Sequence, residues 1–110
     1  AAAGFEIGAH SENHPILSKI PVADAMQEIM ASKARIAEKI GKCSTTFCFP
    51  NGQREDYTKE IVAFCMENFR AALSTNRGYA KIDELFELRR LGISGGPNAV
   101  TFEWTLLRER

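Results

Sequence analysis

The two histidines of the sequence, His10 and His14, are the residues whose type and spacing best suit chemistry. They lie four positions apart in the polar segment 8–15 (GAHSENHP). Two neutral imidazoles at this separation can bind one metal ion, and nitrogen ligands suit zinc and its first-row neighbours. Because a proline disfavours helical backbone at the residue before it, Pro15 predicts a tight loop at His14. Two unrelated surface histidines would show the same His-x-x-x-His pattern, and this alternative stays open.

A strand is expected directly before this histidine pair. Residues 5–9 (FEIGA) form a short apolar run that gives way to the polar segment, which predicts a buried strand running into a loop. In α/β sheets and barrels, binding sites assemble at the carboxyl ends of the strands. The place of His10 and His14 after such a strand therefore favours a site over two incidental histidines.

Helical and extended patterns alternate after the histidines. Apolar residues recur at spacings of three and four over 21–40, which predicts an amphipathic helix. Pro21 suits its first turn, and Gly41 suits the left-handed position just past its end. Residues 44–49 (STTFCF) are β-branched and aromatic and predict a strand that stops at the turn residues 50–52 (PNG).

The remaining residues continue this alternation. Residues 57–69 again show helical spacing, with Asp56 available as a cap, and 70–74 (RAALS) predict the next strand. Residues 100–107 fit a strand or a helix, and we favour the helix because it completes another strand–helix unit. The rest is expected as loops at 76–84 and 92–98 and as an extended piece at 86–91.

Strands that alternate with helices of this length predict parallel pairing through right-handed crossovers, and hence an α/β sheet or barrel. A closed eight-stranded barrel needs roughly 250 residues. The 110 residues here suffice for one domain with its own core and are too few for such a barrel. We therefore expect a single domain over 1–110 that forms an incomplete barrel.

Charge, hydropathy and cysteine usage argue against several classes of protein. Lys plus Arg and Asp plus Glu number 14 each, so there is no basic excess to bind nucleic acid or an anionic membrane. No run approaches the roughly 20 apolar residues of a transmembrane segment. The three cysteines include no Cys-x-x-Cys pair, and we expect buried thiols, with Cys48 and Cys65 in apolar surroundings.

Two motifs carry a resemblance to a known family. Residues 10–15 (HSENHP) match the pattern His-Ser/Thr-x-x-His-Pro at every defined position. The chain thereby resembles the polysaccharide deacetylases, the NodB-homology or carbohydrate esterase family 4 enzymes. Residues 47–52 (FCFPNG) are similar to the family's Phe-x-Tyr-Pro-Tyr-Gly turn, and 88–93 (LRRLGI) to its Leu-Pro-Arg-Ile strand.

This resemblance implies a distorted (β/α) barrel that removes N-linked, or less often O-linked, acetyl groups from a polysaccharide. It also implies a divalent metal, expected to be zinc, held by one Asp and two His. Carried over by position, His10 and His14 are the histidine ligands, and the backbone N–H of Asn51 is a donor to the oxyanion. Pro50, Asn51 and Asp56 would bind the substrate, although a plain turn and a helix cap are the alternatives for these residues. Family members mostly work at the cell envelope, which favours an envelope or extracellular location.

The chain departs from the family pattern at several functional positions. The Asp-Asp pair that supplies the general base and third ligand is absent, so we expect the chain to begin after that motif. No histidine follows His14, although the family's usual acid is a C-terminal histidine. Cys48 stands where an arginine is common, and Asn51 where a tyrosine is. These departures predict that residues 1–110 alone are inactive.

Two other functions stay open at this point. A non-catalytic relative would keep the fold and bind glycan or metal without turnover, and a structural α/β module would carry an incidental histidine pair. In each case a strand at 5–9 without an upstream neighbour exposes an apolar edge, so we expect self-association. Trp104, the sole tryptophan, is expected in the core rather than in a sugar groove.

Overall fold

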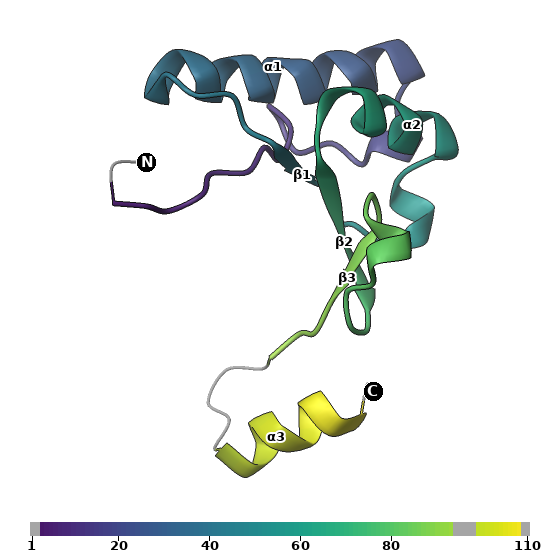
Figure 1. The fold of residues 1–110 in the computed structure, drawn as a ribbon. Helices are drawn as coiled ribbons and strands as arrows, with labels where there is room; N and C mark the ends of the chain where they lie inside the picture. The colour runs from purple at the N-terminus through teal and green to yellow at the C-terminus, as the bar shows by residue number, and fades with distance from the viewer. Residues whose placement is uncertain (1–2, 94–98, 109–110) are drawn as a thin grey trace.

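The computed structural model describes residues 3–93 and 99–108. They include a parallel sheet with two helices packed against one face, and a third helix that lies apart from the sheet (Figure 1). The helices and strands are α1 (Val22–Ile40), β1 (Thr46–Cys48), α2 (Lys59–Asn68), β2 (Ala71–Arg77), β3 (Leu88–Arg90) and α3 (Ala99–Arg108), with single 3-10 turns at Leu17–Lys19, Arg54–Asp56 and Ile82–Glu84. The sheet has the order β1-β2-β3, and both strand pairs are parallel. The expected α/β class with a parallel sheet is confirmed.

Helix α1 matches the predicted helix to within one residue. Ala25 and Ile29, on its apolar face, are both 0% exposed. The helix ends as expected at Gly41, which has a φ of 76° and donates its N–H to the Ala37 carbonyl at 2.9 Å. Pro21 is its N-cap and does not lie in the first turn. No helix in the described part of the chain is long and apolar enough to cross a membrane.

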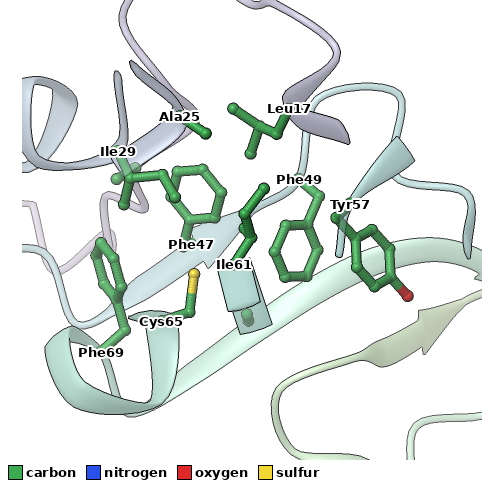
Figure 2. Close-up of a cluster of buried hydrophobic side chains, with 11 residues drawn as sticks. Leu17, Ala25, Ile29, Phe47, Phe49, Tyr57, Ile61, Cys65 and Phe69 are labelled. Atoms are coloured by element: carbon green, nitrogen blue, oxygen red, sulfur yellow. The ribbon is translucent and has the colours of Figure 1, made fainter. Parts of the chain in front are cut away.

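The core lies between the sheet and helices α1 and α2 (Figure 2). The ring of Phe47, in β1, lies 5.6 Å from that of Phe49 and 5.5 Å from that of Phe69. Burying a large apolar side chain contributes about 1.5–3 kcal/mol. This packing fixes β1, which carries the site described below. The buried apolar residues are Ala9, Leu17, Ala25, Ile29, Phe47, Phe49, Tyr57, Ile61, Cys65, Phe69 and Ala72.

The prediction of a strand at 5–9 is wrong for most of these residues. In the described chain, the segment bridges to a strand at Ala9, through one parallel bridge to Phe47 with hydrogen bonds of 2.9 Å to the Thr46 carbonyl and from the Cys48 N–H. Phe5 is 73% exposed and Ile7 40%, so these side chains are not buried. A strand exists through its neighbour's hydrogen bonds, and the described chain offers residues 5–8 no strand to pair with. Figure 1 shows this segment running away from the sheet.

Helix α2 has a different cap from the one expected. It begins at Lys59, and Thr58 caps it by accepting a hydrogen bond from the Ile61 N–H at 3.3 Å. The Asp56 carboxylate instead accepts from the Gln53 N–H at 3.0 Å and closes the preceding 3-10 turn. A capping side chain reaches donors two or three residues ahead, so Asp56 lies too early in the chain to cap α2.

The C-terminal half holds one confirmed element and several corrections. Residues 99–108 form the favoured helix, α3, but Trp104 on it is 64% exposed and does not lie in the core. Strand β2 runs on to Arg77, into the expected loop. Within the other expected loop, residues 94–98 lie outside the described part. Among the thiols, Cys65 is buried as expected, whereas Cys48 is half-buried and Cys43 is exposed.

Candidate functional site

The two histidines come together in a tight loop at the end of the Ala9 bridge. Their ring centroids are 4.8 Å apart, and the rings meet edge to face at 71°. The loop reverses through two left-handed residues, Ser11 with a φ of 67° and His14 with a φ of 57°. The loop geometry predicted from Pro15 is thus confirmed. Both rings are exposed on the surface of the described chain.

His10 is oriented by the strand beside it. Its Nδ1 lies 2.8 Å from the carbonyl oxygen of Cys48 in β1. A carbonyl can only accept a hydrogen bond, so Nδ1 carries the proton and the neutral ring keeps its lone pair on Nε2. A hydrogen bond from one ring nitrogen to a carbonyl is the usual support of a histidine that binds metal through the other. The chemistry of this donor therefore fits a metal ligand.

The other end of the loop is held by its own serine and by α1. The His14 N–H donates to the Ser11 Oγ at 3.0 Å. Asn13 donates its backbone N–H to one carboxylate oxygen of Glu28 at 2.8 Å and its side-chain amide to the other at 2.7 Å. A non-glycine residue in the left-handed region costs on the order of 1–3 kcal/mol. These hydrogen bonds offset that cost.

The turn after β1 forms the second part of the site. The Gly52 N–H donates to the Pro50 carbonyl at 2.7 Å, which closes a three-residue turn around Asn51, whose φ is 61°. Thr75 of β2 holds this turn with two hydrogen bonds. Its hydroxyl donates to the Asn51 carbonyl at 2.6 Å, and its backbone N–H donates to the Gly52 carbonyl at 2.8 Å. The Asn51 N–H donates to no residue of the described chain.

Both parts lie at the same end of the sheet. His10 bonds to the carbonyl of Cys48, the last residue of β1, and the turn follows directly. Asn51 is three residues past Cys48, which limits the separation of their backbones to roughly 11 Å. The structure thus brings the histidine pair and the turn to the carboxyl end of a parallel strand, where sites of α/β folds assemble.

Comparison with known proteins now identifies the family. The model of the polysaccharide deacetylase family matches residues 1–66, more than half of the chain and both parts of the site. The chain belongs to the polysaccharide deacetylase family. No curated protein matched the sequence.

Solved structures of deacetylases show the same fold. A deacetylase from Streptococcus pyogenes in complex with acetate is 21% identical, with a TM-score of 0.78 over 88% of this chain and 42% of that one. A polysaccharide deacetylase from Bacillus cereus is 20% identical, with a TM-score of 0.77 over 96% of this chain and 33% of that one. The chain therefore spans less than half the length of these two deacetylases.

Two of the residues carried over from the family have side chains that are buried or hydrogen-bonded within the chain. The Pro50 ring is buried, and Asp56 is 6% exposed with its carboxylate on the Gln53 N–H. Their contact with a sugar stays a prediction. Among the described residues, no group of three or more His, Cys, Asp or Glu is arranged to hold a metal ion, so His10 and His14 stand as a pair.

A cleft of about 510 Å³ opens beside His10 in this deacetylase fold. Sites for small molecules commonly measure about 300–1,000 Å³. Its walls come from the histidine loop and from α1, so the cleft gives access to His10 from the helix side. Besides His10, the lining residues are Gly8, Ser11, Glu12, Ser32, Arg35 and Ile36.

A buried polar cluster around Tyr57 was not expected from the sequence. The Tyr57 hydroxyl donates to the Glu87 carboxylate at 2.9 Å and accepts from the Asn76 amide at 2.9 Å. Its ring stacks on Phe49, with centroids 4.2 Å apart (Figure 2). Burial, and after it the hydrogen bond to Glu87, raise the pKa of Tyr57. Through this stacking, the cluster supports Phe49, the residue before the Pro50 turn. Its members are too far apart in the sequence for a local pattern to predict the cluster.

Proposed function

We propose that the chain supplies part of the active site of a metal-dependent hydrolase that removes N- or O-linked acetyl groups from a polysaccharide. Membership of the polysaccharide deacetylase family supports the reaction class. The single observation that supports the metal role is the loop that brings the ring centroids of His10 and His14 to 4.8 Å apart. In this loop, Nδ1 of His10 is hydrogen-bonded to the Cys48 carbonyl, which leaves Nε2 for a metal. By analogy with the family, the substrate belongs to the cell envelope or the extracellular space.

The residues of the chain divide the chemistry between them. His10 and His14 would hold a divalent metal, for which zinc fits their nitrogen donors. Such an ion, when bound, lowers the pKa of a water to about 7 and polarises a carbonyl. The Asn51 N–H, which has no acceptor in the described chain, would donate to the oxyanion of the tetrahedral intermediate.

Residues 1–110 supply two of the three metal ligands that the family uses. We assign the third ligand and the general base to the family's Asp-Asp pair, which the sequence lacks. Two ligands leave about half of a tetrahedral shell to water, so the chain by itself should bind zinc weakly. Without a base to deprotonate the water, it should release no acetate.

Acetate release from N-acetylglucosamine oligomers tests this proposal. We expect no turnover by residues 1–110 and turnover by the chain extended upstream as its gene encodes it. In the extended protein, His10→Ala and His14→Ala should each abolish activity. Turnover by residues 1–110 alone would show that the base lies within the chain, and an active His10→Ala variant would remove the histidines from the mechanism.

A non-catalytic relative is the second candidate. The observation that favours it is the absence of any histidine after His14, because the family's usual acid lies there. Such a protein would bind zinc and N-acetylglucosamine oligomers in the extended form and release no acetate. The same assay combined with calorimetry therefore separates the two functions.

A further inference from the structure

We propose that Glu28 of α1 is a positioning residue for the histidine pair and acts through Asn13. This inference rests on the proposed metal role of His10 and His14. Within the described chain, Glu28 makes no hydrogen bond to either ring, and both of its carboxylate oxygens accept hydrogen bonds from Asn13. Asn13 directly precedes His14, so whatever fixes Asn13 also fixes the backbone that carries the second ring.

The carboxylate matches its partner atom for atom. Asn13 has two donors here, its backbone N–H and its side-chain amide. Each donates to a different carboxylate oxygen of Glu28, at 2.8 and 2.7 Å. An ionised carboxylate offers two acceptors and no donor, whereas a glutamine side chain would place an NH2 group against the Asn13 amide. The pair is therefore specific for a carboxylate at position 28.

The position of Glu28 is also fixed relative to the core. Its neighbour Ile29 is 0% exposed and packs in the core cluster beneath α1. The helix axis is thereby fixed against β1, which holds His10 through the Cys48 carbonyl. The loop is thus tied to the strand at His10 and to the helix next to His14.

The loop needs this second tie because its backbone is strained. Ser11 and His14 both have positive φ values, and the bond between Ser11 and the His14 N–H is internal to the loop. An internal bond does not set where the loop lies relative to α1. When the tie to Glu28 is lost, the His14 ring should leave its place beside His10, although the helix itself should persist.

Four variants and a control test the proposal in the 110-residue chain. Glu28→Ala removes both acceptors, and Glu28→Gln removes one. The double variant Asn13→Asp/Glu28→Gln restores both hydrogen bonds with one polarity reversed, because the new amide donates to the new carboxylate. Asn13→Asp alone places two carboxylates together. Glu38→Ala removes a charge from the same helix about 15 Å further along its axis.

Ring-proton Overhauser contacts between His10 and His14 in the metal-free protein provide the first measurement. We expect them in the parent chain and in Glu38→Ala, lost in Glu28→Ala and Asn13→Asp, weakened in Glu28→Gln and restored in the double variant. Circular dichroism should show α1 intact throughout. Contacts that persist in Glu28→Ala, or that the double variant fails to restore, would overturn the positioning role.

Zinc titration followed by NMR provides the second measurement. Removal of a supporting hydrogen bond around a metal ligand typically costs 10- to 100-fold in affinity. We expect a loss of about tenfold in Glu28→Ala and parental affinity in the double variant and in Glu38→Ala. If the parent chain shows ring contacts but no zinc binding, the metal proposal fails while the positioning role stands. If Asn13→Asp alone binds zinc more tightly, position 13 acts as a ligand and the inference is wrong.

Discussion

His10 is held by the backbone carbonyl of Cys48, 2.8 Å from its Nδ1, and the side chain at position 48 takes no part in this contact. Asn51 likewise would act through its backbone N–H, in a left-handed conformation that asparagine tolerates better than most residues. The chain can therefore carry Cys48 and Asn51 where the family commonly has arginine and tyrosine and still form this loop and turn.

Gly52→Ala should lower stability more than Gly41→Ala does. Both residues have positive φ, 79° and 76°, which costs an alanine roughly 1–2 kcal/mol. At Gly52 a Cβ would also lie 2.9 Å from the Thr75 N and 3.0 Å from the Phe49 O, whereas at Gly41 it would meet no atom of the described residues within 4 Å. Urea unfolding should show a loss of about 1 kcal/mol for Gly41→Ala and about 3 kcal/mol for Gly52→Ala. Equal losses of unfolding free energy in the two variants would mean that the turn at residues 50–52 moves to accommodate the added Cβ.

The sequence predicted those residues of the site whose geometry is local. Pro15 constrains His14 across one peptide bond, so the tight loop was foreseeable. The role of Glu28 was not, because its contact with Asn13 depends on where α1 packs over the sheet. For the same reason, nothing in the sequence linked Tyr57 to its partners.

At the level of elements, local periodicity was enough for the helices and not for the first strand. Helix α1 satisfies its own backbone hydrogen bonds, so its apolar spacing predicted its extent to within one residue and Gly41 predicted its end. Residues 5–9 have a strand-like composition, but a strand takes its hydrogen bonds from a neighbouring strand, and within the described chain Ala9 is the residue of this segment that bridges to one. Composition alone could not supply that neighbour.

The Tyr57 cluster joins the loop before α2 to β2 and to the residue ahead of β3, and it should make stability depend on pH. Because the folded-state pKa of Tyr57 is raised, its contribution to stability is complete below about pH 10 and is lost as the pH rises through the folded value. Tyr57→Phe should cost about 1–3 kcal/mol at neutral pH by leaving Asn76 and Glu87 without their partner.

The pH dependence of urea unfolding checks this expectation. The difference in unfolding free energy between the parent chain and Tyr57→Phe should shrink above about pH 10. Tyr79→Phe serves as the control, because Tyr79 is 37% exposed and its hydroxyl donates to the Leu106 carbonyl, away from this cluster. A difference that stays constant to high pH would show that the hydroxyl of Tyr57 is not buried as described.

At the scale of the whole molecule, the chain covers 42% and 33% of two deacetylases that share its fold. The segment that leads into the Ala9 bridge carries exposed apolar side chains, with Phe5 at 73% and Ile7 at 40%. Among the described residues, no strand lies on the far side of this segment. Edges of this kind recruit partners, and we propose that a second copy of the chain binds here.

Light scattering at micromolar concentration should therefore show dimers or larger species. Ile7→Asp should shift the chain towards monomer, because it places a charge on the apolar edge. Ile82→Asp is the matched control, since Ile82 is 86% exposed on the 3-10 turn before β3. A monomeric parent chain with well-protected amides from residue 5 to residue 9 would mean that the edge is covered within the chain.

The central claim is that His10 and His14 bind one divalent metal ion. Anomalous diffraction at the zinc absorption edge, from crystals of residues 1–110 grown with excess zinc, tests it directly. We predict a peak between the two rings, within about 2.1 Å of a nitrogen of each, and no such peak in His10→Ala crystals. A peak elsewhere on the molecule with none between the rings, or one that survives in His10→Ala, would contradict the claim.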